Sequence, residues 1–385
     1  MISLPIECHY PILNNLRYDH KSLFSCALVN RQWCRIIIPI LWSEPKTYFK
    51  DIRLIRILLL TLNDEEKAPL IRFNITLPNH PKPLFEYTSY ITSVSYSLYD
   101  GAKNWLDHEG YKIDRSLDDA IKCSLITMLL RTSKNLKSLS LNEIINDYLI
   151  FESLFENTTI TSMYIYVHVT HFKFLAIDTL VEILYKHSSL TYLDLSYNKL
   201  WSSNVAKLLE ALYENTILNS LNLCNNQIGI EGGKMLAKFL CKNTTLTSLN
   251  LVSNNLGSEG GKALADALCK NTTLISLDLG HNNFGSEEGK ALADALCKNT
   301  TLTNLYLQFN VLRSEGVKAL AGALSINNTL TTLNLCGNNI GSEGGKALAD
   351  VICMNTTLTF LDIRSNYINF RIESSNQNVE ILQYQ

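Results

Sequence analysis

Leucines recur with a period of 28 residues in the C-terminal half of the chain. The pattern LxxLxLxxNx(L/I/F) opens seven times, at Leu190, Leu218, Leu246, Leu274, Leu302, Leu330 and Leu358. The LxL spacing sends alternate side chains to one face, which predicts a short strand. Further along each unit, pairs such as Leu264 and Leu268 stand four residues apart, which predicts one apolar face of a helix.

One strand and one helix cannot bury their apolar faces alone, but stacked copies can, at about 1.5–3 kcal/mol per buried Leu or Ile. The pattern therefore predicts an α/β solenoid with a curved parallel sheet inside and helices outside. We expect it to span residues 135–373, with regular repeats from residue 190. The segments LKSLSL (136–141) and ITSMYI (160–165) are weaker copies of the strand, and ITSVSY (91–96) is a further candidate.

This 28-residue unit closely resembles the ribonuclease-inhibitor class of leucine-rich repeat, from residue 190 to about residue 373. The resemblance implies that the Asn at the end of each strand pattern bonds neighbouring backbone groups. These residues are Asn198, Asn226, Asn254, Asn282, Asn310, Asn338 and Asn366.

A concave sheet exposes the residues between the leucines, so departures from the repeat point to a binding surface. Most repeats carry Asn or Asp at the centre of LxL, whereas the fifth carries Tyr306. Tyr, Phe and Arg are common interface anchors. We predict that a protein substrate contacts Tyr192, Tyr197, His281, Tyr306, Gln308, Phe309, Phe360 and Arg364. For any single residue, the alternative is drift of the repeat without function.

The first 45 residues follow a different pattern. Leu4-Pro5 suits a first helical turn, Asp19 can precede a second helix, and a third runs from about Asn30 toward Trp42. Pro11 must end or bend a helix that begins at Leu4, unless the first helix begins at Pro11. Three such short helices make a very small core, which needs a partner or the following region for stability.

This segment resembles an F-box. The matching motifs are Leu4-Pro5-x-Glu7, Ile12-Leu13-x-x-Leu16, Cys26-x-x-Val29-x-x-x-Trp33 and Leu41-Trp42, over residues 2 to about 43. The resemblance implies that residues 1–45 bind a Skp-family adaptor, and through it the cullin and RING subunits of a ubiquitin ligase. The resemblance also implies which residues contact the adaptor or support the residues that do. They are Leu4, Pro5, Ile12, Leu16, Leu28, Val29, Trp33 and Trp42. Internal packing of the three helices is the alternative for each of these residues.

Residues 46–134 are expected to form an irregular linking region. Its pattern predicts an apolar helix over Tyr48 to Leu62, a solvated turn at residues 63–67, and a helix over Asp118 to Ser133. Residues 374–385 lack the pattern of a capping helix and are expected to form a tail.

Composition limits the partners and the compartment. The 34 Lys and Arg balance 36 Asp and Glu, which argues against nucleic-acid binding because no basic excess neutralises phosphates. The most apolar run is too short to cross a membrane, and the N-terminus lacks a signal-peptide pattern. Ten cysteines without CxxC or zinc spacing predict free thiols, no metal and a reducing cytoplasmic or nuclear compartment.

Two recurrent motifs resemble chemical sites. Asn243, Asn271, Asn299 and Asn355 open glycosylation acceptors, but without a secretory signal we predict a structural role: a left-handed Asn that ends each helix. GSEGGKAL (257–264) is one residue short of a phosphate-binding loop and lacks its Ser or Thr. We expect its glycines to let the start of the helix approach the sheet. No cofactor or catalytic residue is indicated, so we do not expect an enzyme.

The combined patterns predict a substrate-recognition subunit of an SCF-type cullin–RING E3 ubiquitin ligase. In that function the N-terminal helices bind the adaptor, and the solenoid binds an unidentified protein to be ubiquitinated. One alternative is a leucine-rich-repeat scaffold with no ligase role. The other is a repeat protein resembling Ran GTPase-activating proteins, although the sequence marks no GTPase-directed loop.

Overall fold

The computed structural model describes residues 6–45, 48–79, 81, 83, 85–142, 148–166, 175–186, 189–374 and 378–383. The chain forms two compact units. The first comprises Met1–Ile165 with His187–Ser189, and the second comprises Tyr166–Lys186 with Leu190–Gln385. In the part of the chain that the structure describes, no helix is long and apolar enough to cross a bilayer.

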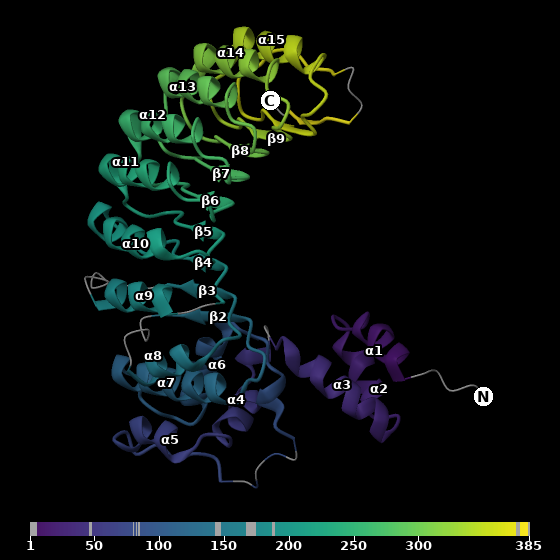
Figure 1. The fold of residues 1–385 in the computed structure, drawn as a ribbon. Helices are drawn as coiled ribbons and strands as arrows, with labels where there is room; N and C mark the ends of the chain where they lie inside the picture. The colour runs from purple at the N-terminus through teal and green to yellow at the C-terminus, as the bar shows by residue number, and fades with distance from the viewer. Residues whose placement is uncertain are drawn as a thin grey trace, which may run out of the picture. The chain divides into compact units, whose positions relative to one another are not determined.

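The second unit is a repeating strand–helix solenoid, with strands along one side and helices along the other (Figure 1). Its strands are β4 (Tyr192–Asp194), β5 (Ser220–Asn222), β6 (Ser248–Asn250), β7 (Ser276–Asp278), β8 (Asn304–Tyr306), β9 (Thr332–Asn334), β10 (Phe360–Asp362) and β11 (Glu380–Leu382). Its helices are α9 (Leu175–Lys186), α10 (Ser202–Glu214), α11 (Gly229–Leu240), α12 (Gly257–Leu268), α13 (Ser286–Leu296), α14 (Arg313–Leu324) and α15 (Gly341–Ile352).

All these strands pair in parallel and in register. The central leucines of neighbouring strands face one another, as in the pairs Leu221↔Leu249 and Leu277↔Leu305. The leucines of the repeat are buried, with Leu264 and Leu277 at 0% exposure. The predicted leucine-rich-repeat solenoid is therefore confirmed in this unit.

Buried asparagines connect each repeat to the next, as the resemblance implied. Asn282 donates from Nδ2 to the Leu251 carbonyl at 2.9 Å, and its Oδ1 accepts the N–H groups of Asn254 and Leu256 at 3.1 and 3.3 Å. The side chain is 0% exposed. Because buried backbone groups need partners, this ladder supplies hydrogen bonds where the chain leaves the strand.

The asparagines of the Asn-Thr-Thr segments have a structural role, but the predicted mechanism is wrong. Positive φ angles occur at other residues and not at Asn243, Asn271, Asn299 or Asn355. Asn271, 4% exposed, instead donates to the Leu240 carbonyl of the preceding repeat at 2.8 Å and accepts the Leu274 N–H at 2.7 Å. The side chain, and not a left-handed backbone, makes the turn.

The glycines of the helix starts allow close approach, mainly between neighbouring helices. A Cβ placed on Gly289 would lie 2.8 Å from the Cα of Gly316, and one on Gly233 would lie 3.3 Å from the Cα of Gly260. The contact at Gly289 is shorter than a real Cβ atom makes without a shift of its neighbours, and the contact at Gly233 is tighter than most real Cβ contacts. We predicted that these glycines let the helix start approach the sheet; at Gly289 and Gly233 they instead let one helix approach the next.

The first unit carries three further parallel strands, β1 (Ser93–Val94), β2 (Ser138–Leu141) and β3 (Ser162–Ile165). The candidate strand at ITSVSY is therefore confirmed. Around these strands lie η1 (Tyr48–Lys50), α4 (Ile52–Leu59), α5 (Asp64–Ile71), η2 (Tyr87–Tyr90), α6 (Ser97–His108), α7 (Arg115–Thr132) and α8 (Tyr148–Glu156).

The predicted solvated turn at residues 63–67 is wrong. Asn63 caps α5 by accepting the Glu66 N–H at 2.8 Å, and the Glu66 carboxylate accepts the Asn63 N–H in return. Glu66 is only 2% exposed and pairs with Arg131 of α7, with Nε–Oε1 at 2.7 Å. The charged run is a helix start whose third acidic residue has a partner far along the chain.

The N-terminal segment forms the three predicted helices, α1 (Ile6–Asn14), α2 (His20–Ala27) and α3 (Arg31–Ser43). Asp19 caps α2 by accepting the Ser22 N–H, and Asn30 caps α3 by accepting the Trp33 N–H at 2.8 Å. Pro11 lies inside α1 and neither ends nor begins it. The buried cluster consists of Leu13, Leu23, Ala27, Ile37 and Ile40.

Candidate partner-binding surfaces

The turn after each strand of the second unit holds a left-handed residue that is exposed in several repeats. Tyr197, His281 and Phe309 occupy this position, with φ of 61°, 54° and 54°. Because this conformation is unfavourable for L-residues, neighbouring backbone bonds must hold it. The N–H groups of His281 and Phe309 donate to the carbonyls of Gln308 and Cys336 at 2.9 and 2.7 Å.

His281 and Phe309, equivalent in two successive repeats, form a stacked pair. Their ring centroids lie 4.5 Å apart with an interplanar angle of 22°. Phe309 is 50% exposed. In the next repeat the same position is Gly337, where a Cβ would lie 2.7 Å from the Phe309 ring. The glycine thus gives the phenyl ring room to lie along the surface.

A polar pair lies beside these rings. Gln308 donates from Nε2 to Asp278 Oδ1 at 3.1 Å, and its side chain passes over Gly280. Burial raises the pKa of the Asp278 carboxyl, while hydrogen bonds from the Gly280 N–H and from Gln308 oppose the rise. Tyr306 pairs with Asp278 in the sheet register and so lies beside it on the same face. We call the residues Asp278, His281, Tyr306, Gln308 and Phe309 the β7–β8 cluster.

The other predicted substrate-binding residues lie toward the two ends of this face. Tyr192 donates to Asp194 Oδ2 at 3.2 Å. At the far end Arg364 pairs with Asp362, which is only 2% exposed, at 2.6 Å, and Phe360 is half-buried on β10. Strands β4 and β8 are four spacings apart, or about 19 Å. The eight residues therefore form one extended face in three groups and not a single pocket.

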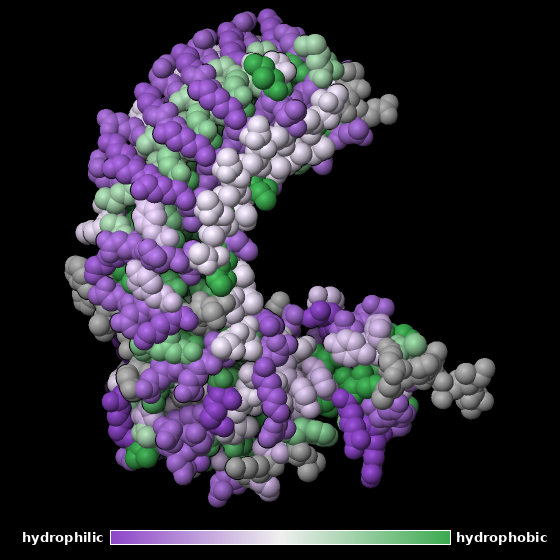
Figure 2. Space-filling model, in the orientation of Figure 1, coloured by the Kyte–Doolittle hydropathy of each residue, from purple (hydrophilic) through white to green (hydrophobic). Residues whose placement is uncertain are grey.

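The hydropathy of the second unit differs between its sides. Figure 2 shows strongly hydrophilic residues along the helices, whereas the strip along the strands is close to neutral. Glu and Lys pair along the helix starts, for example Lys290 with Glu287 at 2.9 Å. The strand side, with few charges and several aromatic rings, is the better protein-binding surface.

Sequence reasoning missed the residues that support the β7–β8 cluster. Asp278 was recognised only as a polar residue of the repeat, and Gly280 and Gly337 were not singled out. The available signal was positional: each glycine stands where other repeats carry a side chain. Where one repeat carries glycine and the preceding repeat carries an aromatic residue at the same position, as with Gly337 and Phe309, the glycine leaves room for the ring.

The N-terminal helices present a second candidate surface, within the first unit. Ile12, Phe24, Leu28 and Val29 are 52%, 60%, 72% and 61% exposed. Phe24 and Leu28 are four residues apart, so they lie on the same side of α2 and its C-terminal end. Phe24 also lines a cavity of about 450 Å³, together with residues that include Trp42, Tyr48 and Leu54.

The remaining adaptor candidates are placed differently. Leu16 and Trp33 are partly buried and pack against the core cluster of the three helices. Trp42 stacks on Tyr87 with ring centroids 4.5 Å apart, so it joins α3 to the rest of the first unit. Leu4 and Pro5 lie outside the described residues. Of the six candidates that the structure describes, Ile12, Leu28 and Val29 are more than half exposed.

Comparison with known families identifies the repeats. The TMOD/LMOD leucine-rich domain matches residues 178–313, and a leucine-rich repeat family matches residues 327–349. Neither match reaches the three N-terminal helices. The chain thus contains leucine-rich repeats of the kind that mediate protein–protein interaction. No curated protein matches the chain.

Several solved structures resemble part of the chain. Leiomodin-1 actin-binding site 2 is 27% identical, with a TM-score of 0.32, over 34% of this chain and 77% of that one. The tropomodulin C-terminal domain of Caenorhabditis elegans is 17% identical, with a TM-score of 0.32, over 35% and 81%. The leucine-rich repeat-containing protein LegL7 from Legionella pneumophila is 24% identical, with a TM-score of 0.45, over 62% and 78%.

Proposed function

We propose that the protein is a substrate-recognition subunit of an SCF-type cullin–RING E3 ubiquitin ligase. The N-terminal helices bind a Skp-family adaptor, which joins the cullin and RING subunits. The concave face of the repeats binds the protein to be ubiquitinated. The receptor performs no chemistry itself; it raises the effective concentration of a bound substrate near the ligase. The proposal places the protein in the cytoplasm or nucleus.

The observation that carries this proposal is the exposed apolar surface of the N-terminal helices. Among the described residues, five form their buried cluster, with partly buried hydrophobic side chains packed against it, yet Ile12, Phe24, Leu28 and Val29 are each more than half exposed. Phe24 and Leu28 share one side of α2 and its C-terminal end, and exposed apolar side chains on a shared face favour a protein interface. Since a small helical unit gains stability by covering such side chains, a protein adaptor fits this surface.

The β7–β8 cluster supports the second half of the proposal. Stacked rings with an ordered polar neighbour lose little side-chain freedom on binding, which favours them as interface anchors. The cluster lies within residues 178–313, where the chain matches a leucine-rich domain family. The scaffold with no ligase role would use the same face, and actin, which the name of the leiomodin-1 segment mentions, serves as a comparison ligand.

The experiment compares two variants of the full chain in affinity capture. Leu28→Ala/Val29→Ala should weaken binding of a purified Skp-family adaptor by about tenfold or more, equivalent to about 1.4 kcal/mol, and leave captured clients unchanged. Phe309→Ala should do the reverse. Ser253→Ala is the matched control, because Ser253 holds the same left-handed turn position in another repeat.

The outcomes separate the functions. If the unmodified chain does not bind the adaptor while circular dichroism shows it folded, the ligase proposal is wrong. If it instead sediments with actin filaments and Phe309→Ala abolishes this, the protein is a scaffold of a different kind. Clients that are captured equally well by Phe309→Ala would exclude the β7–β8 cluster as their site.

A further inference from the structure

The asparagine ladder defines a hydrogen-bonding slot that recurs at each junction between repeats. The Nδ2 of one Asn donates to the carbonyl of a preceding-repeat leucine at all six junctions. The distances are 3.0 Å to Leu195, 2.8 Å to Leu223, 2.9 Å to Leu251, 3.1 Å to Leu279, 2.8 Å to Leu307 and 2.8 Å to Leu335. Every leucine carbonyl in this position thus receives a carboxamide N–H from the next repeat.

The Oδ1 of the same side chain accepts two backbone N–H groups at four of these junctions. Asn226, Asn282, Asn310 and Asn366 do so, with distances between 2.7 and 3.4 Å. At Asn338 only the Leu312 N–H donates, and at Asn254 the Oδ1 has no partner. The slot therefore offers one carbonyl acceptor and, in its complete form, two N–H donors.

The last slot of the solenoid is formed by Ile363, Asn366 and Ile368. By equivalence with the preceding repeat, its groups are the Ile363 carbonyl and the N–H groups of Asn366 and Ile368. Within the described ranges neither N–H has an acceptor, and the Ile363 carbonyl receives only the Nδ2 of Asn366 itself, at 3.0 Å. The equivalent Leu335 carbonyl receives a second carboxamide, from Asn366.

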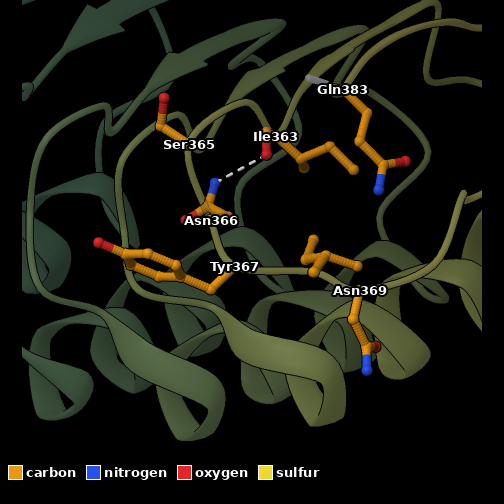
Figure 3. A pocket seen from close by; sticks show the side chains of 7 residues that line it. Ile363, Ser365, Asn366, Tyr367, Asn369 and Gln383 are labelled. Carbon is orange, nitrogen blue, oxygen red and sulfur yellow. Dashed lines mark hydrogen bonds between the residues drawn. The ribbon is translucent and has the colours of Figure 1, made fainter. Parts of the chain in front are cut away.

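A cavity opens at this slot. It has a volume of about 530 Å³ and is lined by Ile363, Ser365, Asn366, Tyr367, Ile368, Asn369 and Gln383. Figure 3 shows these side chains around the opening, with the bond from Asn366 to the Ile363 carbonyl drawn as a dashed line. Tyr367 is 82% exposed at its border.

The carboxamide of Gln383 lines the cavity but does not fill the slot. Its oxygen accepts the Ile372 N–H at 2.9 Å, and its nitrogen donates to the Phe370 carbonyl at 2.6 Å. These bonds fix the loop that precedes β11. Among the described residues, none donates or accepts the hydrogen bonds that would complete the slot of Ile363, Asn366 and Ile368.

We propose that this cavity binds the side-chain carboxamide of an asparagine supplied by a partner polypeptide. One oxygen that accepts both N–H groups and one nitrogen that donates to the Ile363 carbonyl match the three groups of the slot. A carboxylate supplies the acceptor but no donor, and it places negative charge against the carbonyl. The site extends the ladder by one step and is independent of the proposed ligase function.

The test uses a peptide copied from the repeat, residues 330–342 (LTTLNLCGNNIGS), and the isotopically labelled full chain. The peptide carries the ladder residue Asn338 and, next to it, Asn339, which is exposed in the structure. We expect amide chemical-shift changes at Asn366 and Ile368, with an affinity on the order of 1 mM.

Matched peptides decide the assignment. Asn338→Ala and Asn338→Asp should each weaken binding by about tenfold, since they remove hydrogen bonds to the slot. Asn339→Ala should bind like the parent peptide. The proposal fails if the parent peptide produces no shift at Asn366 and Ile368, if the shifts lie elsewhere, or if Asn338→Ala binds as tightly as the parent.

Discussion

The repeats of the second unit and the non-repeating part of the first unit satisfy their buried polar groups in different ways. In the repeats one residue type does the same task at each junction, as Asn282 and Asn310 show. In the first unit, the buried polar groups that have partners are paired individually, and a few buried atoms, such as Trp105 Nε1 and Thr127 Oγ1, have no hydrogen-bond partner within the described residues. Glu66 pairs with Arg131, and the Tyr99 hydroxyl donates to the Ser140 carbonyl at 2.6 Å. A hydrogen bond that recurs in every repeat can be recognised from one sequence, whereas an individual pair such as Glu66 and Arg131 cannot.

Cavity-forming substitutions test whether the two regions also differ in cooperativity. Leu23→Ala in the N-terminal helices and Leu277→Ala in the repeats both truncate leucines of 0% exposure, at a cost of about 2–5 kcal/mol each. Leu23→Ala should unfold α1–α3 as a group, because their core holds five residues. Leu277→Ala should lower the melting temperature while each repeat stays folded below it. Hydrogen exchange of the two variants measures this difference.

Equal loss of protection in the repeats and in α1–α3 for Leu23→Ala would contradict that expectation. It would show that the small core is stabilised by the rest of the chain and does not unfold separately.

Replacing one asparagine of the ladder measures how much its hydrogen bonds contribute to the free energy of unfolding. Asn282→Ala leaves buried carbonyl and N–H groups without partners, which should destabilise the chain by about 3 kcal/mol. Asn283→Gly is the control, since Asn283 is exposed and left-handed with φ of 59°, and glycine tolerates that backbone. Urea denaturation should place the control within about 0.5 kcal/mol of the unmodified chain.

Replacing Arg131 of the Glu66–Arg131 ion pair measures the corresponding contribution to the free energy of unfolding in the first unit. Arg131→Ala leaves the Glu66 carboxylate, 2% exposed, without its guanidinium. We expect a loss of about 2 kcal/mol, which is less than for a fully buried pair because the Arg131 side chain is 43% exposed. Glu66→Gln/Arg131→Met should recover part of the loss in urea denaturation; a double variant as unstable as Arg131→Ala would contradict the charge-based explanation.

The smallest expected effect concerns Asp278 of the β7–β8 cluster. Burial raises its pKa above that of the unfolded chain, so the folded state binds the proton more tightly and the ionised carboxylate costs stability at neutral pH. Asp278→Asn should therefore be more stable than the unmodified chain by a few tenths of a kcal/mol at pH 7. Thermal melts should show this advantage shrinking as the pH falls through the raised pKa of the folded state and levelling off below the unfolded pKa. An advantage that grows on acidification would reverse the sign assigned here.

The same contrast explains what the sequence could predict. The 28-residue leucine period specified strands, helices and parallel register, because each position is repeated seven times. The role of Asn271 was assigned wrongly, since one letter does not distinguish a left-handed backbone from a side chain that bonds the preceding repeat. The turn predicted at residues 63–67 failed because the partner of Glu66 lies 65 positions away.

The candidate sites show the same limit. Tyr306 and Phe309 were found because they interrupt a regular pattern. Their arrangement could not be predicted, since the stack of Phe309 on His281 depends on the space that Gly337 leaves. At the N-terminus the motif named eight residues, but only the packing shows that Trp33 faces inward while Leu28 faces outward.

The glycine contacts between helices have a geometric consequence. Strands repeat about every 4.8 Å, whereas packed helices prefer axes about 8–10 Å apart, and this mismatch bends the array into an arc. Where Gly289 of α13 meets Gly316 of α14, the two helices come close together. The helix side of the array is therefore shorter, the mismatch with the strand side is smaller, and the arc has a larger radius. Bulkier residues at these outward positions would tighten the arc. They would thereby change which partner fits inside it without altering any residue that the partner touches.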